Sequence, residues 1–339
     1  MASVDAQNFR LAVLNPRGRD VEQHFENADT ADNEHAPVNF HAFAACTRGA
    51  VFRDIARVVT SGWPALVLLR GDFRASERAL RELKRAGRTT AVALKETGGH
   101  QIAQQLGDPV RFARFNRIVA QANGCIGTTP EAAELFRSVG KEAVIFIPTP
   151  YPIDLANWNF ATENQCGIFV GTREFDVPSR NHVAALLGAK RLSDATGEPV
   201  TVYNLDARRG RQLIAEIGFA KICVREKRID YRAYLRDVAA HKIVFQLDRS
   251  RVPGQVAGDA VLCRSVCVGG DGAIERIAFP QTCGEKRSDT ELSEIALRLL
   301  QNENERHALA EGATKIAEER LSFRAGREAL ARFFAQLRG

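Results

Sequence analysis

The stretch that decides the fold opens with a short apolar run, Ile168-Phe169-Val170, which ends in Gly171-Thr172-Arg173. It closes on Gly258-Asp259-Ala260-Val261-Leu262-Cys263 and on Arg264-Ser265-Val266-Cys267-Val268-Gly269-Gly270. Between these segments, apolar strand-like runs alternate with amphipathic helical runs, which is typical of a parallel sheet covered by helices. Such sheets bind ligands at the carboxyl ends of their strands. We therefore expect a ligand site at the strand ends between Cys166 and Pro280.

The same alternation fills the rest of the second half. The pattern predicts strands at 167–171, 199–204, 221–224, 242–247 and 265–268, and helices at 179–194, 208–217, 230–239, 289–302 and 304–319. Ser322 has the side chain of a helix cap and predicts a last helix that runs to the C-terminus. The segment Gly269–Glu275 is predicted to be a flexible, glycine-rich loop.

The first half has a comparable pattern. It predicts strands at 9–14, 64–70, 89–94, 124–127 and 143–147, helices at 51–60, 75–86, 110–121 and 130–139, and a polar surface loop at 21–37. Three prolines between Pro148 and Asp154 form a stiff connector. We expect an α/β protein with two doubly wound Rossmann-like domains facing across a cleft. Their predicted bounds are 1–160 and 161–320, with a C-terminal helix at 321–339 that packs back on the first domain.

Length and composition narrow the class of protein. A chain of 339 residues favours two domains, and 45% hydrophobic with 26% charged residues is typical of a soluble globular protein. No apolar run approaches the roughly 20 residues that span a bilayer, and Asp5, Gln7 and Asn8 stand where a secretory signal would be apolar. We expect a cytoplasmic protein. The seven scattered cysteines fit no zinc spacing and are predicted to be reduced and structural.

The net charge of +6 favours an anionic partner. Most of the excess is arginine, whose guanidinium binds phosphate through paired hydrogen bonds. An anionic membrane surface at the inner membrane face, or a nucleic acid, would suit the same charge. The alternative is that these arginines only solvate helix faces.

Two common nucleotide motifs are absent from the sequence. No Gly-x-Gly-x-x-Gly follows either first strand, and no Gly-Lys-Ser/Thr of a P-loop occurs, which argues against a nicotinamide dehydrogenase and a P-loop ATPase. The layout instead resembles the GT-B glycosyltransferases, and most closely the family-four type. Four segments carry the resemblance: Ile147–Asp154 is similar to "I-P-N-G-V-D", Phe169–Arg173 to "V-G-R", Arg180-Asn181 to a helix-opening Lys-Asn, and Asp259–Val268 to "E-A-M-A-x-G-x-P-V-V".

The resemblance implies a nucleotide-sugar donor site in the second domain. Arg173 and Arg180 would stabilise the charge on the diphosphate, Asp259 would bind the ribose hydroxyls, and the strand-end loops would complete the site. The full set of expected donor residues is Gly171, Thr172, Arg173, Arg180, Arg251, Asp259, Gly270 and Asp271.

The chain departs from the family where the donor sugar binds. The family's motif has two glutamates, and Arg251 stands at the position of the first. We expect the sugar contact to move to Asp271 or to the Arg249/Arg251 pair, which would suit an acidic sugar. The alternative for each of Arg173 and Arg180 is a surface salt bridge.

The hydroxyl acceptor is expected on the first domain. Arg17-Gly18-Arg19 follows the first strand, and Lys95-Glu96-Thr97-Gly98-Gly99-His100 follows the strand at 89–94. If the reaction inverts configuration, Glu96 or His100 is the candidate general base, whereas a retaining reaction needs none. The alternatives are a plain turn at Arg17–Arg19, and Glu96 paired with a neighbouring cation while His100 caps a helix.

No cofactor or metal is expected, because arginines and helix ends can neutralise a diphosphate and no Asp-x-Asp stands at a strand end. Two other functions stay open: a glycosyltransferase that modifies DNA bases, and a non-catalytic, degenerate GT-B binding module. An epimerase of this fold is a third. The donor base, the sugar, the acceptor, the stereochemistry and the oligomeric state do not follow from the sequence.

Overall fold

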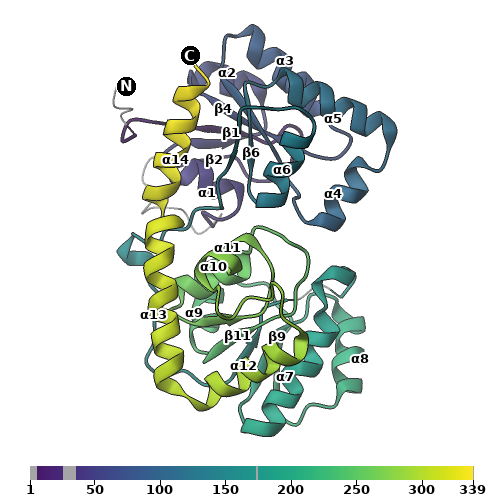
Figure 1. Ribbon diagram of the computed structural model, residues 1–339, viewed down its shortest axis with the longest axis vertical. Coiled ribbons are helices and arrows are strands. Elements are labelled where there is room, and N and C mark those ends of the chain that lie inside the picture. The colour runs from purple at the N-terminus through teal and green to yellow at the C-terminus, as the bar shows by residue number, and fades with distance from the viewer. Residues whose placement is uncertain (1–5, 26–35, 173–174, 339) are drawn as a thin grey trace. The chain divides into compact units, whose positions relative to one another are not determined.

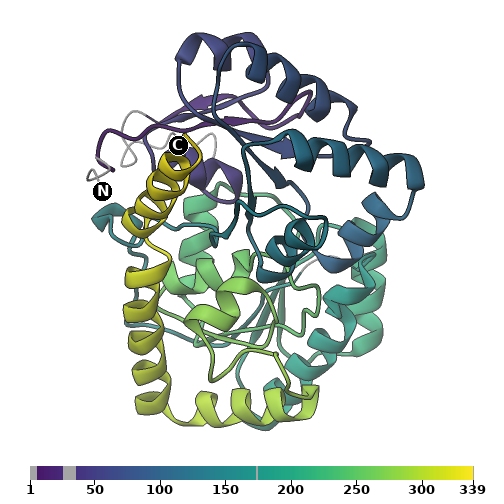
Figure 2. The same cartoon turned by 45° about the horizontal axis from the view of Figure 1, so that its top comes forward.

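The computed structural model describes residues 6–25, 36–172 and 175–338 (Figure 1). The chain divides into two compact units, one formed by Met1–Asp154 with Arg320–Gly339 and the other by Leu155–Glu319. Each unit holds a mostly parallel sheet with helices around it (Figure 2). The predicted fold class, an α/β protein with two Rossmann-like units, is confirmed.

The sheet of the first unit has the order β2-β3-β1-β4-β5-β6-β7. Its strands are β1 (Ala12–Leu14), β2 (Gln23–His24), β3 (Ala50–Phe52), β4 (Ala65–Leu69), β5 (Thr90–Leu94), β6 (Gly124–Gly127) and β7 (Val144–Phe146). All neighbours are parallel except β2 and β3. The chain goes from β1 to β3 on one side and then to β4 on the other. The carboxyl ends of β1 and β4 therefore form a topological switch point.

Seven helices of the described residues cover this sheet: α1 (Phe40–Ala45), α2 (Ile55–Ser61), α3 (Arg74–Arg85), α4 (Gly99–Leu106), α5 (Pro109–Gln121), α6 (Pro130–Ser138) and α14 (Phe323–Gln336). Apolar residues of β1, β3, β4 and β5 share one core with α2, α3 and α5. Phe115 lies at its centre, with its ring centroid 6.1 Å from that of Phe73 and 5.7 Å from that of Phe136. On the other face, α1 contacts α14.

The C-terminal segment belongs to the first unit through contacts at both of its ends. The Asp154 carboxylate accepts hydrogen bonds from the backbone N–H groups of Phe323 (3.3 Å) and Arg324 (3.1 Å). Ser322 caps α14 by accepting from the N–H of Ala325. Further along, the ring of Phe334 packs 5.7 Å from that of Phe9.

The sheet of the second unit has the order β10-β9-β8-β11-β12, with all neighbours parallel. Its strands are β8 (Ile168–Val170), β9 (Val200–Tyr203), β10 (Ile222–Arg225), β11 (Ile243–Phe245) and β12 (Val266–Val268). After β8 the chain adds β9 and β10 on one side and then crosses to β11. The switch point of this unit therefore lies between the carboxyl ends of β8 and β11.

The helices of the second unit lie in two groups. They are α7 (His182–Thr196), α8 (Ala207–Ile217), α9 (Tyr231–Ala239), α10 (Gln255–Leu262), α11 (Ala273–Ala278), α12 (Asp289–Gln301) and α13 (Glu303–Arg320), with short 3-10 turns η2 (Ala156–Trp158) and η3 (Pro178–Arg180). The helix α7 contacts α8 and α12, whereas α10 contacts α9, α11 and the strands β11 and β12. In the described part of the chain, no helix is long and apolar enough to cross a membrane.

Four local predictions differ from the structure. The helix predicted from Val51 begins at Ile55, because residues 50–52 pair with β1 as the strand β3 and Asp54 caps the helix by accepting from the Ala56 N–H. The pattern missed α1, α4 and α11, which have six, eight and six residues. Helices this short depend on tertiary packing more than on propensity. Because α11 begins at Ala273, the predicted loop Gly269–Glu275 ends at Gly272. In the predicted surface loop at 21–37, Gln23–His24 forms β2, and positions 26–35 lie outside the described residues.

Candidate functional site

The switch point of the second unit is built around Gly171. This residue follows β8, and its N–H donates to the carbonyl of Phe245 on β11 (3.0 Å). A Cβ at Gly171 would lie 2.4 Å from Cγ1 of Val256, so only glycine fits against the first turn of α10. The N-terminal N–H groups of α10 therefore lie next to the carboxyl end of β8, where they favour an anion.

Thr172 follows Gly171, and its side chain contacts α7. Its Oγ1 lies 2.9 Å from Nδ1 of His182, the first residue of α7, and both residues are buried. The ring of Phe175 packs edge-on to the imidazole at 4.3 Å. Burial lowers the pKa of His182 to about 4, so the imidazole is neutral near pH 7. The predicted phosphate ligand Arg173 lies outside the described residues.

Three further predicted donor residues are linked, directly or through one another, to the buried residue Asp248. Nη1 of Arg180 donates to the carboxylate of Asp248, which also accepts from the N–H of Ser250 (2.7 Å). The backbone carbonyl of Asp248 accepts from the N–H of Asp271 (3.1 Å). The Asp271 carboxylate in turn accepts from the N–H of Arg251 (2.8 Å). The structure thus brings Arg180, Arg251 and Asp271 together, with Asp248 as the centre that the sequence did not indicate.

The two arginines of the predicted sugar contact differ in their surroundings. Arg249 is bound to the loop before α12, where Nη2 donates to the Arg287 carbonyl (2.8 Å) and to Asp289 (2.9 Å). The side chain of Arg251 is 63% exposed, and its Nε lies 3.9 Å from the Asp271 carboxylate. Arg251 is therefore the member of the pair that can meet a ligand.

A buried glutamate lies beneath the glycines of the site. Cβ atoms at Gly254, Gly272 and Gly270 would lie 2.1, 2.3 and 3.0 Å from carboxyl oxygens of Glu275. Oε1 accepts from Nε2 of Gln246 (2.9 Å), and Oε2 has no hydrogen-bond partner within the described ranges. Burial, and secondarily the charge of Asp248, raise the pKa of Glu275 to about 8. From the sequence, Glu275 was indicated only as the last residue of the predicted loop Gly269–Glu275.

Asp259, the predicted ribose ligand, is 2% exposed. Its Oδ1 accepts a hydrogen bond from the hydroxyl of Tyr231 (2.5 Å), which stacks on Tyr234 at 6.2 Å. The Tyr231 hydroxyl therefore already occupies one oxygen of the predicted ribose ligand.

In the first unit, two predicted acceptor segments meet. The loop after β1 is closed by Gly18, whose Cβ would lie 2.2 Å from Nδ2 of Asn15, and the carbonyl of Arg17 accepts from Nη1 of Arg70 (3.1 Å). Nδ2 of Asn15 donates to Asp20 (2.6 Å), and Lys95 from the loop after β5 forms an ion pair with the same carboxylate.

Asp20 is the charged centre of this contact. Burial alone would raise its pKa, but the hydrogen bond and charge of Lys95 outweigh it and lower the pKa. Asp20 therefore stays ionised at neutral pH, and it belongs to the loop that the sequence had indicated only through Arg17, Gly18 and Arg19.

Glu96 and His100, the candidate bases, are both exposed. The Glu96 side chain makes no ion pair with Lys95, which binds Asp20 instead, and His100 lies in the first turn of α4. Neither side chain forms a hydrogen bond or ion pair with any residue that the structure describes. Both can therefore reach a ligand without breaking a contact.

Comparison with solved structures identifies the architecture. Anabaena Alr3699/HepE in complex with UDP matches 97% of this chain and 100% of its own, with 15% identity and a TM-score of 0.66. An alpha,alpha-trehalose 6-phosphate synthase from Burkholderia multivorans matches 97% and 99%, with 10% identity and a TM-score of 0.68. The fold is that of the GT-B glycosyltransferases.

A third structure of this fold is a variant of TarM from S. aureus, solved with fondaparinux, alpha-GlcNAc-glycerol and UDP. It matches 86% of this chain and 58% of its own, with 12% identity and a TM-score of 0.63. No protein-family model matches the sequence, and no curated protein matches it significantly. The GT-B fold is thus established, whereas membership of the family-four type stays a prediction.

No metal-binding group of three or more His, Cys, Asp or Glu side chains occurs in residues 6–25, 36–172 and 175–338. The expectation that this GT-B protein works without a metal stays a prediction. Three residues that sequence reasoning missed are Asp20, Asp248 and Glu275. Asp20 and Asp248 lie in the loops after β1 and β11, and Glu275 lies in α11, which follows the loop after β12. Their position behind strands of a parallel sheet is the one signal that points to them.

Proposed function

We propose that this chain transfers a sugar from a nucleoside diphosphate donor to a hydroxyl acceptor. The observation that carries the proposal is the convergence at the switch point of the second unit. There the first turn of α10 packs on Gly171, while the loops after β11 and β12 are joined through Asp248 and Asp271. A GT-B fold with N–H groups and arginines at this place is suited to a diphosphate.

The residues proposed to bind the donor are assigned from the charge of the diphosphate. As the bond to the sugar breaks, negative charge grows on the terminal phosphate, and the N-terminus of α10 with Arg180 would stabilise it. Arg173 is retained as a proposed phosphate ligand on sequence grounds. Arg251, exposed beside Asp271, would face the donor sugar and favour one that carries an acid group.

The acceptor end is proposed at the switch point of the first unit. Asp20, kept ionised beside Lys95, would accept a hydrogen bond from an acceptor hydroxyl. In an inverting reaction Glu96 or His100 would remove the proton of the attacking hydroxyl. In a retaining reaction the leaving phosphate would take it.

One observation favours a second candidate, a GT-B module that binds without catalysis. Arg251 replaces a carboxylate of the family pattern, and Asp259 is held by Tyr231. Such a module would bind a nucleotide sugar but would not transfer the sugar to any acceptor.

A thermal-shift screen tests the proposal. A true donor stabilises the folded state by mass action, so one nucleoside diphosphate and its sugar should raise the melting temperature above all others. UDP is the first to test, since HepE and TarM were solved with it. Absence of any shift would remove the proposed function, and binding without transfer to a panel of sugars and lipid-linked sugars would favour the module.

Two variants locate the binding. Arg180→Lys keeps a charge beside Asp248 but loses the planar fork that grips phosphate, so we expect weaker UDP binding with the fold intact. Arg251 has a φ of 50°, which glycine adopts freely, so Arg251→Gly should change only the preference among sugars. Arg264→Gly removes an arginine of equal φ (53°) elsewhere in the unit and should change neither.

A further inference from the structure

A cavity of about 470 Å³ lies in the first unit, beside β2, β3 and α2. Arg10, Gly49 and Trp63 line it, and they precede β1, β3 and β4 respectively. Arg17–Arg19 and Glu96, in contrast, follow the carboxyl ends of β1 and β5. Since these strands are parallel, most of the cavity lies toward the amino ends of β1, β3 and β4, and its wall continues along β3 and α2 to Phe52, Ala56 and Arg57. The cavity has the volume of a small-molecule site.

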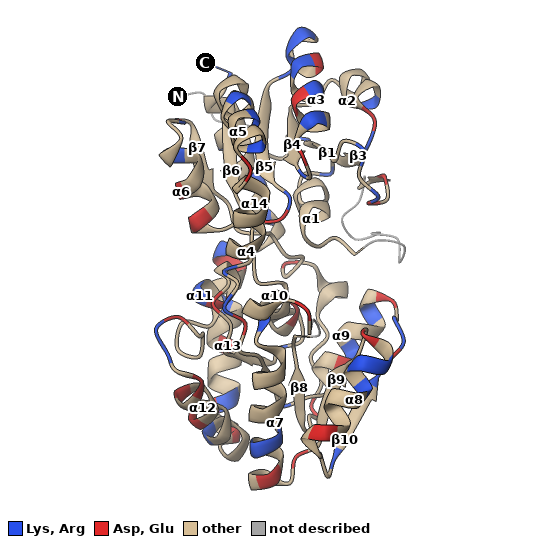
Figure 3. Ribbon diagram, turned by 90° about the vertical axis from the view of Figure 1, so that its right-hand side faces the viewer, with Lys and Arg blue, Asp and Glu red and all other residues tan. Residues whose placement is uncertain are grey.

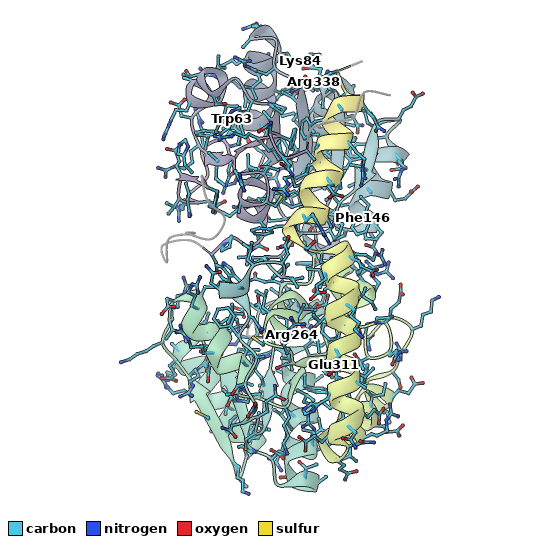
Figure 4. The ribbon with its side chains drawn as sticks, turned by 90° about the vertical axis from the view of Figure 1, so that its left-hand side faces the viewer. Trp63, Lys84, Phe146, Arg264, Glu311 and Arg338 are labelled. Carbon is cyan, nitrogen blue, oxygen red and sulfur yellow. The ribbon has the colours of Figure 1, made fainter. Side chains whose placement is uncertain are left out.

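The walls of the cavity combine arginines with aromatic rings. The guanidinium of Arg10 lies 5.6 Å from the ring centroid of Trp63, and that of Arg57 lies 5.5 Å from the ring centroid of Phe52. The imidazole of His24 packs edge-on to Phe52 at 5.4 Å. The rings hold two guanidiniums in place at the cavity wall. Figure 4 labels Trp63 within this unit, and Figure 3 shows Lys and Arg on α3, which contacts α2.

Of the three arginines that line the cavity, only Arg57 has an acidic partner within the described residues. Arg57 pairs with Glu22 at 2.5 Å. Neither Arg10 nor Arg48 forms an ion pair with any acidic residue that the structure describes, and both are exposed. Two guanidinium charges therefore face the cavity without an acidic partner among these residues.

Arg48 stands at a position that normally belongs to glycine. It follows α1 in a Schellman turn, in which the Arg48 N–H donates to Ala45 (3.1 Å) and the Gly49 N–H to Ala44 (2.9 Å). Its φ is 51°, in the left-handed region. An arginine there costs conformational energy that glycine would not, and it places a guanidinium at the cavity.

We propose that this cavity binds a small organic phosphate at a site separate from glycosyl transfer. A phosphomonoester carries a charge of about −1.5 to −2 at neutral pH, which matches the guanidiniums of Arg10 and Arg48, the two that have no acidic partner among the residues the structure describes. A single carboxylate would balance only one of them, and a dicarboxylate such as succinate carries its two charges on separate groups. The volume exceeds that of a phosphate alone, and the Trp63 and Phe52 rings offer apolar surface to the organic part.

The chain offers a direct reporter for this site. It has two tryptophans, Trp63 in the cavity and Trp158 in the second unit. Nε1 of Trp158 has no hydrogen-bond partner within the described ranges, so Trp158→Phe removes no such bond and leaves Trp63 as the only indole. In this background we would titrate the full chain with glucose 6-phosphate, AMP, inorganic phosphate and succinate at low ionic strength, and follow the emission.

We expect a saturable change in Trp63 emission with glucose 6-phosphate or AMP, and weaker binding of both inorganic phosphate and succinate. A tighter constant for AMP would assign a nucleotide, and a tighter one for glucose 6-phosphate a sugar phosphate. Arg48→Gly should weaken binding roughly ten-fold, as the loss of a charge-assisted hydrogen bond implies. Its fold is safe, because glycine suits the turn.

The matched control is Arg264→Gly. Arg264 follows α10 in the same kind of turn, with its N–H donating to Val261 (3.1 Å) and that of Ser265 to Ala260 (3.0 Å). It should bind like the background. The proposal is overturned if no probe saturates, if succinate binds as well as the phosphates, or if Arg48→Gly binds like Arg264→Gly. It is equally overturned if Arg251→Gly abolishes the signal, since the probe would then occupy the donor site.

Discussion

A methyl group on Gly171 would lie 2.4 Å from Cγ1 of Val256 and 3.2 Å from Cγ1 of Val244. The end of β8 and the first turn of α10 are therefore in backbone-to-side-chain contact, and this contact sets where the N–H groups of α10 point. The position of the proposed diphosphate site depends on the absence of one carbon atom.

We predict that Gly171→Ala destabilises the protein by about 1–3 kcal/mol through overpacking. It should also weaken UDP binding, because α10 must shift. Adding Val256→Ala to this variant should restore most of the stability and most of the UDP binding. Gly312→Ala is the control: no atom lies within 4 Å of the new Cβ in α13, so stability should rise by about 0.5–1 kcal/mol. Urea unfolding and a UDP titration measure these effects, and a Gly171→Ala protein as stable as the wild type would contradict the packing argument.

His182 gives a stability that depends on pH. Its pKa is about 4 in the folded protein, against 6.5 as the ordinary value, because burial disfavours the charged ring. Between these values the unfolded chain binds more protons, so stability is present above pH 6.5 and is lost as the pH falls toward 4. The loss amounts to about 3 kcal/mol.

Replacing His182 by Gln should flatten this part of the pH profile, measured by urea unfolding between pH 4 and 7.5. His307→Gln, at a histidine whose side chain is 57% exposed on α13, should leave the slope unchanged. Equal slopes for His182→Gln and the wild type would show that the imidazole is not held neutral.

Glu275 contributes a pH dependence of stability that is opposite in direction to that of His182. Its pKa is about 8 when folded and 4.5 ordinarily, so the folded state binds more protons between these values. The stabilisation is full below pH 4.5 and is lost as the pH rises through 8, by roughly 4–5 kcal/mol. Glu275→Gln, which mimics the protonated acid, should therefore melt higher than the wild type at pH 8.5 and close to it at pH 4.5. Glu311→Gln, an exposed carboxylate on α13 that Figure 4 labels, should melt like the wild type at both.

The sequence predicted the long elements of this fold well. The strands β4, β5, β8 and β9 are buried on both faces. Strands buried in this way have continuous apolar sequences, so the apolar runs predicted them correctly. The cysteines at positions 46, 125, 263 and 267 are buried in the core, as expected of small hydrophobes. What failed were three helices of eight residues or fewer and a three-residue strand, since packing rather than local pattern decides them.

The candidate site was predictable in place but not in detail. Strand ends and glycines indicated Gly171, Thr172 and the loops at Arg251 and Gly270. The pairing of Arg180 with Asp248 joins residues 68 positions apart, and Asp20 meets Lys95 across 75. Contacts at such separations depend on how the loops of different strands meet, so no local sequence pattern predicts them. The burial of Asp259 and its hydrogen bond from Tyr231 are also not predicted by any local sequence pattern.

The final prediction concerns the proposed general base. If transfer inverts configuration, either Glu96→Gln or His100→Asn should lower kcat by about 10²–10⁴ while UDP binding is unchanged, because neither side chain holds the fold together through a described contact. Glu134→Gln, on α6 of the same unit and exposed to 72%, should keep full activity. If the product retains configuration, both variants should stay active, since no base is required. Full activity of both variants with an inverted product would show that another group removes the proton, and Asp20 beside Lys95 would be the next carboxylate to replace.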